Sequence, residues 1–343
     1  MNRFSFLTQQ ADRSRVPVAL LSGFLGSGKT TLVNALLRDP RMAGTAVAVN
    51  EFGEIPLDRD LIDHGADKTV VMANGCLCCN LSGDMEDAVM RLFSRRQDGA
   101  VPRFERLIIE PSGLSDPAPI AQAVLRNPVM SRVFRLEVIV TAVDGLFAPM
   151  QAERHPEWGK QVGLADRLVL TKTDLVPAEA VGGLRDLVRD YNPAAPIVAS
   201  VMGEVEAGVL FPAAFFDPEA GAPPSRSGLF AESVDPAHLG RYASVSLRAE
   251  GPLHWRRFDD WLRRIRLGHA EQLLRVKGML HVGGVDGPVV VQGVHHVLNA
   301  PVERDAWPDG ERTSRLVLIA DRATIADARR SWAEALPGML AET

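Results

Sequence analysis

Short apolar runs alternate with helical patterns through the first part of the chain. The runs of strand type cover 16–22, 69–73, 104–109 and 165–170, and the helical patterns between them include 29–37 and 81–95. Strands that alternate with helices are typical of a mostly parallel sheet with helices on its faces. This part of the chain therefore predicts an α/β domain, whose ligands we expect at the carboxyl edge of the sheet.

The later part of the chain has a different pattern. Between 202 and 236 it is rich in Gly, Pro, Ala and Ser without a sustained period, which indicates a linker. Strand patterns follow at 241–247, 273–282, 288–297 and 315–319, and helical patterns at 253–265 and 323–339. We therefore expect an α/β domain at 14–203, a linker at 204–239 and a smaller α+β domain with an antiparallel sheet at 240–340.

Composition and charge limit the classes of function. The chain has 343 residues, of which 46% are hydrophobic and 24% charged, enough for two globular domains. Its formal net charge of −5 argues against a nucleic-acid partner held by a basic surface. No apolar run is long enough for a signal peptide or a membrane span, so we expect a soluble, cytoplasmic protein with no membrane partner.

A glycine-rich loop follows the first strand pattern. Residues 23–30 have the sequence GFLGSGKT, which matches G-x-x-x-x-G-K-[ST], and a helical pattern begins at Lys29. The glycines let backbone N–H groups point at phosphate oxygens, Lys29 neutralises charge on the β- and γ-phosphates, and the Thr30 hydroxyl can bind Mg²⁺. The motif predicts a nucleoside triphosphate site. Its expected contacts are Gly23, Gly26, Ser27, Gly28, Lys29, Thr30 and Thr31.

Two further strand ends carry candidate nucleotide contacts. Glu110 follows the run 104–109, where an acidic residue is the usual second Mg²⁺ anchor, and Gly113 can present its N–H to a γ-phosphate. A turn with a solvated glutamate is the alternative. After the run 165–170, Asp174 can accept hydrogen bonds from the N1–H and N2 amino group of guanine, or the segment TKTD can cap a strand end before the next helix.

All three cysteines of the chain lie within four residues, at Cys76, Cys78 and Cys79. Cysteines this close together strain any disulfide among themselves, whereas thiolates from one turn suit a borderline ion such as Zn²⁺ or Co²⁺ and leave a coordination position open. Packing as small buried apolar side chains is the alternative. The cluster follows the run 69–73, so we expect it on a strand-to-helix loop at the same sheet edge as the phosphate loop.

In order along the chain, the segments GFLGSGKTT, NEFGE, GCLCC, EPSGLSDP and TKTD resemble the motifs of the CobW-type family of GTP-dependent metallochaperones. The later segments GRYASVSLRAEGPL, LLRVKGML and SRLVLIA are similar to the C-terminal domain of that family. The phosphate loop alone is common to many NTPases, but five motifs in this order are highly specific. The resemblance implies a P-loop GTPase domain with a mostly parallel sheet, followed by a smaller α+β domain.

The resemblance also assigns roles to residues. It implies that GTP occupies the phosphate loop and that Lys172 and Asp174 recognise guanine. It implies that the three cysteines bind Zn²⁺ or Co²⁺ for delivery to a client metalloprotein or a metal-cofactor pathway enzyme, and that EPSG responds to the γ-phosphate. Lys29, Glu110 and Glu54 are the candidates for roles in hydrolysis, with Glu54 orienting water or binding metal. We expect a monomer or a weak homodimer.

The chain departs from the family pattern at several positions. Thr171 stands where the general GTPase signature has Asn. Val49 and Asn127 stand where some relatives have an acidic residue and a histidine that help to bind metal, so the three cysteines with Glu54 are the remaining candidate ligands. The chain has no histidine-rich tract, and its one adjacent pair, His295-His296, falls in a predicted strand where successive side chains point to opposite faces.

Two other interpretations predict different behaviour. A metabolic NTPase or kinase with a structural zinc site predicts a small-molecule acceptor pocket and metal bound equally with every nucleotide. A redox sensor predicts oxidation of Cys78 and Cys79 without a nucleotide effect. In the leading hypothesis, a GTPase that chaperones a metal, the γ-phosphate holds NEFGE and EPSG in one arrangement, and hydrolysis releases them and changes the metal site.

Overall fold

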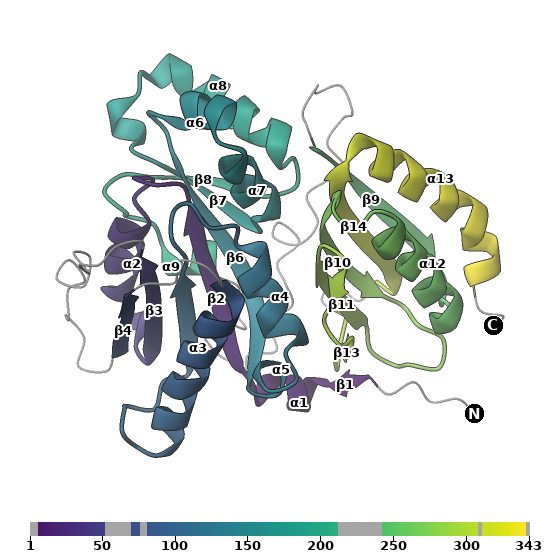
Figure 1. Cartoon of the computed structure of the whole chain (residues 1–343). Coiled ribbons are helices and arrows are strands. Elements are labelled where there is room, and N and C mark those ends of the chain that lie inside the picture. The colour runs from purple at the N-terminus through teal and green to yellow at the C-terminus, as the bar shows by residue number, and fades with distance from the viewer. Residues whose placement is uncertain (1–5, 52–69, 76–80, 212–241, 308–310, 341–343) are drawn as a thin grey trace. The chain divides into compact units, whose positions relative to one another are not determined.

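The computed structural model of the chain describes residues 6–51, 70–75, 81–211, 242–307 and 311–340 (Figure 1). These residues divide into two compact units. The parallel-sheet unit comprises the described parts of Arg15–Val188 and Ala195–Ala220, and the mixed-sheet unit comprises those of Met1–Ser14, Arg189–Ala194 and Gly221–Thr343. None of the described helices is long and apolar enough to cross a membrane.

The parallel-sheet unit contains seven parallel strands in the order β4-β3-β5-β2-β6-β7-β8. In chain order they are β2 (Val16–Gly23), β3 (Thr45–Glu51), β4 (Val70–Gly75), β5 (Arg106–Glu110), β6 (Phe134–Asp144), β7 (Arg167–Thr171) and β8 (Ile197–Ser200). Every residue of β2 and β5 is buried, as expected for strands that are covered on both faces. The predicted α/β class is confirmed.

Helices cover both faces of this sheet. They are α2 (Lys29–Leu37), α3 (Leu81–Gln97), α4 (Ala118–Arg126), α5 (Met130–Val133), α6 (Ala148–Arg154), α7 (Pro156–Leu164), α8 (Ala178–Tyr191) and α9 (Ala207–Leu210), with 3₁₀ turns η1 (Pro40–Met42) and η3 (Thr173–Leu175). On one face, Leu32 and Leu36 of α2 and Leu210 of α9 pack into an apolar core with the strands. The helices α3, α4 and α7 cover the opposite face (Figure 1). In such a doubly wound sheet, all the strand-to-helix loops meet at one edge.

The mixed-sheet unit contains a second seven-stranded sheet, with the path β1-β13-β11-β10-β14-β9 and β12 beside β11. Its strands are β1 (Leu7–Thr8), β9 (Tyr242–Glu250), β10 (Leu273–Leu280), β11 (Val289–Val294), β12 (Val297–Leu298), β13 (Val302–Glu303) and β14 (Thr313–Asp321). The helices α12 (Trp255–Gly268) and α13 (Arg322–Met339) lie on one face of the sheet (Figure 1). All pairings are antiparallel except that of β1 with β13, so the predicted α+β class is confirmed.

The apolar face of α12 builds the core of this unit. Trp261, Leu262 and Ile265 recur at helical spacing and are buried against the sheet. The Trp261 ring meets the Trp332 ring of α13 edge-on, with 4.9 Å between the ring centroids. The apolar helical face predicted for 253–265 is therefore confirmed.

Two features of this unit differ from the sequence-based expectation. Residues 7–13 form β1 and α1 (Gln9–Arg13), which join the mixed sheet through the parallel pairing with β13 and an Asp12–Arg304 ion pair of 3.0 Å. The prediction of one strand through His295-His296 is wrong. The two histidines form the turn between β11 and β12, where His295 has a φ of +51°. The alternation of side chains between the two faces of a strand therefore does not apply to these two histidines.

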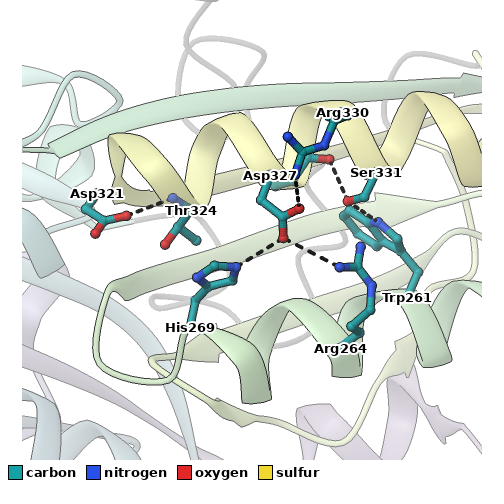
Figure 2. A network of polar contacts seen from close by, with 9 residues as sticks. Trp261, Arg264, His269, Asp321, Thr324, Asp327, Arg330 and Ser331 are labelled. Carbon is teal, nitrogen blue, oxygen red and sulfur yellow. Dashed lines mark hydrogen bonds and ion pairs between the residues drawn. The ribbon is translucent and has the colours of Figure 1, made fainter.

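A carboxylate bridges the two helices of the mixed-sheet unit (Figure 2). Asp327 of α13 contacts His269 at 3.1 Å, Arg264 at 3.5 Å and Arg330 at 3.0 Å. The hydrogen bond with His269 is the main cause that lowers the pKa of Asp327 below its usual 3.8, and both arginines act in the same direction against the effect of burial. The network ties α13 to the C-terminal end of α12.

We predict that Asp327→Asn destabilises the unit in a pH-dependent way. Because the folded state lowers the pKa of Asp327, the carboxylate stabilises the fold above about pH 4 and loses this contribution as the pH falls below that value. Urea unfolding followed by tryptophan fluorescence should show a lower midpoint for the variant near neutral pH and a difference that shrinks in acid. The control is Asp286→Asn at an exposed turn. A difference that stays constant with pH contradicts the prediction.

Candidate functional site

The loop between β2 and α2 holds the phosphate-binding motif in a tightly curled form. Gly23 and Gly28 have φ angles of +146° and +84°, which residues with a side chain rarely adopt. A Cβ on Gly23 would lie 2.4 Å from the Ala142 carbonyl oxygen of β6, so only glycine fits at this position. Gly28 is the N-cap of α2 and makes no side-chain cap, which leaves that helix end suited to an anion.

The structure brings three predicted residues together at this loop. Lys29 is 8% exposed, and its Nζ donates to the Phe24 carbonyl oxygen at 3.2 Å, which folds the side chain back over the loop. Thr30 Oγ1 donates to Glu110 Oε1 at 2.9 Å, and Glu110 is buried at the end of β5. A hydroxyl and a carboxylate are hard oxygen donors of the kind that Mg²⁺ prefers, so the donor set fits this ion.

The other predicted loop residues complete the turn into α2. Ser27 is fully buried, Gly26 has a φ of +73°, and Thr31 is exposed on the first turn of the helix. Sequence reasoning missed the loop after β8, which approaches the same turn. A Cβ on Gly203 of that loop would lie 2.6 Å from the Thr31 carbonyl oxygen. The short Met-Gly segment after a strand gave only a weak signal for this contact.

The turn that follows β5 lies directly against the phosphate loop. A Cβ on Gly113 would lie 2.7 Å from the backbone nitrogen of Leu25, so no larger residue fits there without a shift. The Ser115 N–H donates to the Ser112 carbonyl oxygen at 2.9 Å and closes the turn. The predicted partners Glu110 and Gly113 thus both lie beside the loop.

Thr171, at the end of β7, bonds the phosphate loop from the other side. Its Oγ1 lies 2.8 Å from the Ser27 carbonyl oxygen and 3.1 Å from that of Val143. Carbonyl oxygens only accept, so the one hydroxyl hydrogen of Thr171 is shared between them. The residue that replaces the Asn of the general GTPase signature therefore still ties this strand end to the loop.

The two residues predicted to recognise a base follow Thr171. Lys172 has a φ of +56° and places its Nζ 2.7 Å from Oδ2 of Asp144, whose Oδ1 accepts from the Leu146 N–H at 2.9 Å. Asp144 is 1% exposed, and these contacts satisfy its charge. Asp174 is exposed in η3. Sequence reasoning missed Asp144, although an apolar strand that ends in an acidic residue was the signal used for Glu110.

Strand order sets the distance between the end of β4, the strand before the cysteine segment, and the end of β2, the strand before the phosphate loop. β4 is the edge strand of the sheet, and β3 and β5 separate it from β2. With about 4.8 Å between neighbouring strands, the end of β4 lies about 14 Å from the end of β2. The predicted metal ligands Cys76, Cys78 and Cys79, and Glu54, lie outside the described residues. Within the described part of the chain, no group of three or more His, Cys, Asp or Glu could hold a metal ion.

Val49 and Asn127, where the resemblance implied a departure from the family pattern, have structural roles. Val49 is buried in β3. Asn127 follows α4, and its Oδ1 accepts from the backbone N–H groups of Val129 at 2.9 Å and Met130 at 3.1 Å, while its Nδ2 donates to Glu86. Asn127 therefore caps the turn into α5.

These features define a class of protein. A curled glycine loop joins a buried strand to a helix, a threonine and a carboxylate meet beside it, and a Thr-Lys-x-Asp strand end is bonded to it. That combination characterises a P-loop nucleotide-binding protein of the GTPase type.

Comparison with known proteins identifies the family. Residues 17–199 match the family model described as CobW/HypB/UreG, nucleotide-binding domain. Residues 242–336 match the cobalamin synthesis protein cobW C-terminal domain. The chain belongs to the CobW/HypB/UreG family of GTPases and carries the CobW C-terminal domain, so the resemblance stated from its motifs is confirmed.

Individual relatives match over nearly the whole chain. The chain is 32% identical over 318 residues to the zinc chaperone YjiA of Escherichia coli. This match covers 93% of the chain and 98% of YjiA. It is 28% identical over 365 residues to the zinc chaperone CobW of Pseudomonas aeruginosa, with 93% and 92% covered. The crystal structure of Zn(II)-bound YjiA GTPase from E. coli superposes with a TM-score of 0.68 and 27% identity, and covers 94% of this chain and 99% of that chain.

We predict that the tether from Thr171 supports nucleotide binding. Thr171→Val keeps the side-chain shape but removes the donor to two buried carbonyl oxygens, so GDP affinity should fall about tenfold. Thr171→Ser keeps the hydroxyl and should bind GDP like the wild type. Isothermal titration with GDP measures both. Equal affinity of the valine variant and the wild type would show that the tether does not position the loop.

Proposed function

We propose that this chain is a GTP-hydrolysing zinc metallochaperone that passes its metal to a client metalloprotein or to an enzyme of a metal-cofactor pathway. Family membership supports GTP use, and the relatives YjiA and CobW are named as zinc chaperones. The observation that supports the proposal most directly is the sheet edge shared by the strands that precede the cysteine segment and the phosphate loop. The strand that leads into the cysteine segment ends at the same edge as the strand that leads into the phosphate loop.

In this proposal, GTP binds along the loop 23–31. The loop N–H groups and the N-terminus of α2 face the phosphates, and the Lys29 ammonium neutralises β- and γ-phosphate charge. Lys172 and Asp174 recognise guanine. The exposure of Asp174 supports this role, because an exposed carboxylate can accept from both the N1–H and the N2 amino group of the base.

Hydrolysis then depends mainly on positioning and charge. Thr30 and Glu110 would hold Mg²⁺, which neutralises the charge that develops on the transferring phosphoryl group. Gly113 directs its N–H at the γ-phosphate, and its contact with the phosphate loop supports this role. Glu54 is the candidate to orient the attacking water. We expect slow intrinsic turnover, as in GTPases that rely on electrostatic stabilisation.

A substitution of Glu110 tests the proposed Mg²⁺ role. Glu110→Gln removes the negative charge that faces Thr30, so we expect Mg²⁺ affinity in the hydrolysis reaction to fall about 10–100-fold. Phosphate release measured across a Mg²⁺ titration gives this value. The matched control is Glu105→Gln, an exposed glutamate just before β5 that should leave the titration unchanged. An unchanged Mg²⁺ requirement in Glu110→Gln removes Glu110 from the ion's site.

For the metal cargo, we propose that the thiolates of Cys76, Cys78 and Cys79 bind Zn²⁺ or Co²⁺, which accept the same ligands. The strand that leads into the cysteine segment ends about 14 Å from the strand that leads into the phosphate loop, so the coupling we propose between metal and γ-phosphate is indirect. The ends of β3 and β5 lie between the two sites in the sheet, so the segments NEFGE and EPSG that leave them are suited to relay the state of the nucleotide. Loss of the γ-phosphate would release both segments and weaken metal binding.

Metal titration in two nucleotide states tests this coupling. To move the ion from mostly held to mostly released, affinity must differ by a factor of about 10⁴ between the states. We expect tighter Zn²⁺ binding with a non-hydrolysable GTP analogue than with GDP, and a smaller difference in Lys29→Ala, which removes the ammonium that neutralises γ-phosphate charge. Equal dissociation constants in the wild type would favour a structural zinc site. Cysteine oxidation that is indifferent to nucleotide would favour a redox sensor.

A further inference from the structure

A buried glutamine on α7 lies behind the turn that follows β5. Gln161 is 1% exposed, and its Nε2 donates to the carbonyl oxygens of Gly113 and Ser115, each at 3.0 Å. The backbone carbonyl oxygen of Gln161 accepts from Thr141 Oγ1 of β6 at 3.0 Å, which fixes this end of α7 to the sheet. One side chain therefore bonds both ends of the Gly113–Ser115 turn to a rigid element.

The chemistry of these atoms fixes the orientation of the amide. Carbonyl oxygens only accept hydrogen bonds, so Nε2 has to face them, and the flipped amide would set oxygen against oxygen. The other end of the amide, Oε1, is buried and has no hydrogen-bond partner within the described part of the chain. The two hydrogen bonds from Nε2 therefore attach the turn to α7.

The turn needs a restraint from outside because Gly113 has no side chain of its own. Gly113 packs on the backbone of Leu25 in the phosphate loop, and the N–H of Gly113 is the donor proposed for the γ-phosphate. The Ser115 N–H bond to the Ser112 carbonyl oxygen closes the turn internally but does not attach it to the rest of the unit. The amide of Gln161 supplies that attachment.

We propose that Gln161 is a positioning residue that holds Gly113 against the phosphate loop, so that its N–H is set in advance for the γ-phosphate. The inference rests on the proposed GTPase function and extends it to a residue outside the nucleotide motifs. Fixing a donor before the ligand arrives reduces the entropy lost on binding. This gain in affinity applies to GTP and not to GDP, because GDP has no γ-phosphate to accept a hydrogen bond from the Gly113 N–H.

Lys160 supplies a matched control from the same helix. Its Nζ lies 3.3 Å from Oδ2 of Asp116, just beyond the turn, and both side chains are partly exposed. A surface ion pair of this kind contributes little. Lys160→Met and Gln161→Met therefore place the same side chain at neighbouring positions, and only the second removes the attachment of the turn.

The experiment compares the affinities of full-length variants for GDP and for a non-hydrolysable GTP analogue by isothermal titration. In Gln161→Met, we expect affinity for the analogue to fall about tenfold, GDP affinity to stay within about twofold, and kcat for GTP hydrolysis to fall with the analogue affinity. Lys160→Met should match the wild type in all three. Equal losses for both nucleotides, or no loss for either, would overturn the role of Gln161.

A second variant gives a readout that a purely structural role would not change. In its ionised form, at high pH, Gln161→Glu sets a carboxylate against two carbonyl oxygens, so discrimination between the two nucleotides should then fall further than in Gln161→Met. Protonation of the introduced carboxyl restores one hydrogen-bond donor. The ratio of affinity for the GTP analogue to affinity for GDP, compared with that of the wild type, should therefore recover as the pH falls. A relative ratio that does not change with pH contradicts the proposal.

The proposed GTPase function and the positioning role of Gln161 are tested by different outcomes. A wild-type chain that does not hydrolyse GTP overturns the proposed function. A wild-type chain that does hydrolyse GTP, with a Gln161→Met variant that behaves like Lys160→Met, overturns only the positioning role of Gln161.

Discussion

The hydrogen bond from Thr30 to Glu110 joins the two segments of the chain on which the nucleotide site depends. Thr30 is held by the curled loop at the start of α2, and Glu110 by its buried place at the end of β5. Because both partners lie on regular elements, the sheet itself sets their separation. The turn that begins after Glu110 then brings Gly113 onto the phosphate loop. Any change in the spacing of β5 and β2 would therefore alter all of these contacts together.

Buried polar side chains brace this junction on both sides. Thr171 bonds the phosphate loop from β7, Lys172 is anchored to Asp144 of β6, and Gln161 bonds the turn from α7. Hydrogen bonds in a buried setting are strong, and an unpaired partner there is costly, so these contacts restrict the loops to few arrangements. The phosphate loop and the turn after β5 are irregular in conformation, but their positions are fixed by the regular elements around them.

The sequence predicts some of this architecture and not the rest, for physical reasons. Strands such as β2 and the helix from Lys29 carry long apolar patterns and a glycine motif, which are local signals. The hydrogen bonds of Gln161 join residues nearly fifty positions apart and leave no periodic trace. The prediction of one strand through His295-His296 is wrong because a two-residue turn between apolar strands interrupts the apolar pattern too briefly to change it. The two-residue strand β1 is likewise too short to give a period, and only its partner β13 defines it.

The pairing of β1 with β13 makes the parallel-sheet unit an insertion within the mixed-sheet unit. Residues 7–13 are synthesised before the whole parallel-sheet unit, and β13 is synthesised long after it. On the ribosome, β1 therefore has no sheet to join until the chain is nearly finished, so the mixed-sheet unit is the last to be completed. A fragment that starts at β9 would lack β1 and would leave β13 as the exposed edge strand of the sheet, open to association with other chains. The boundary of this unit is thus set by strand pairing and not by the position of the linker alone.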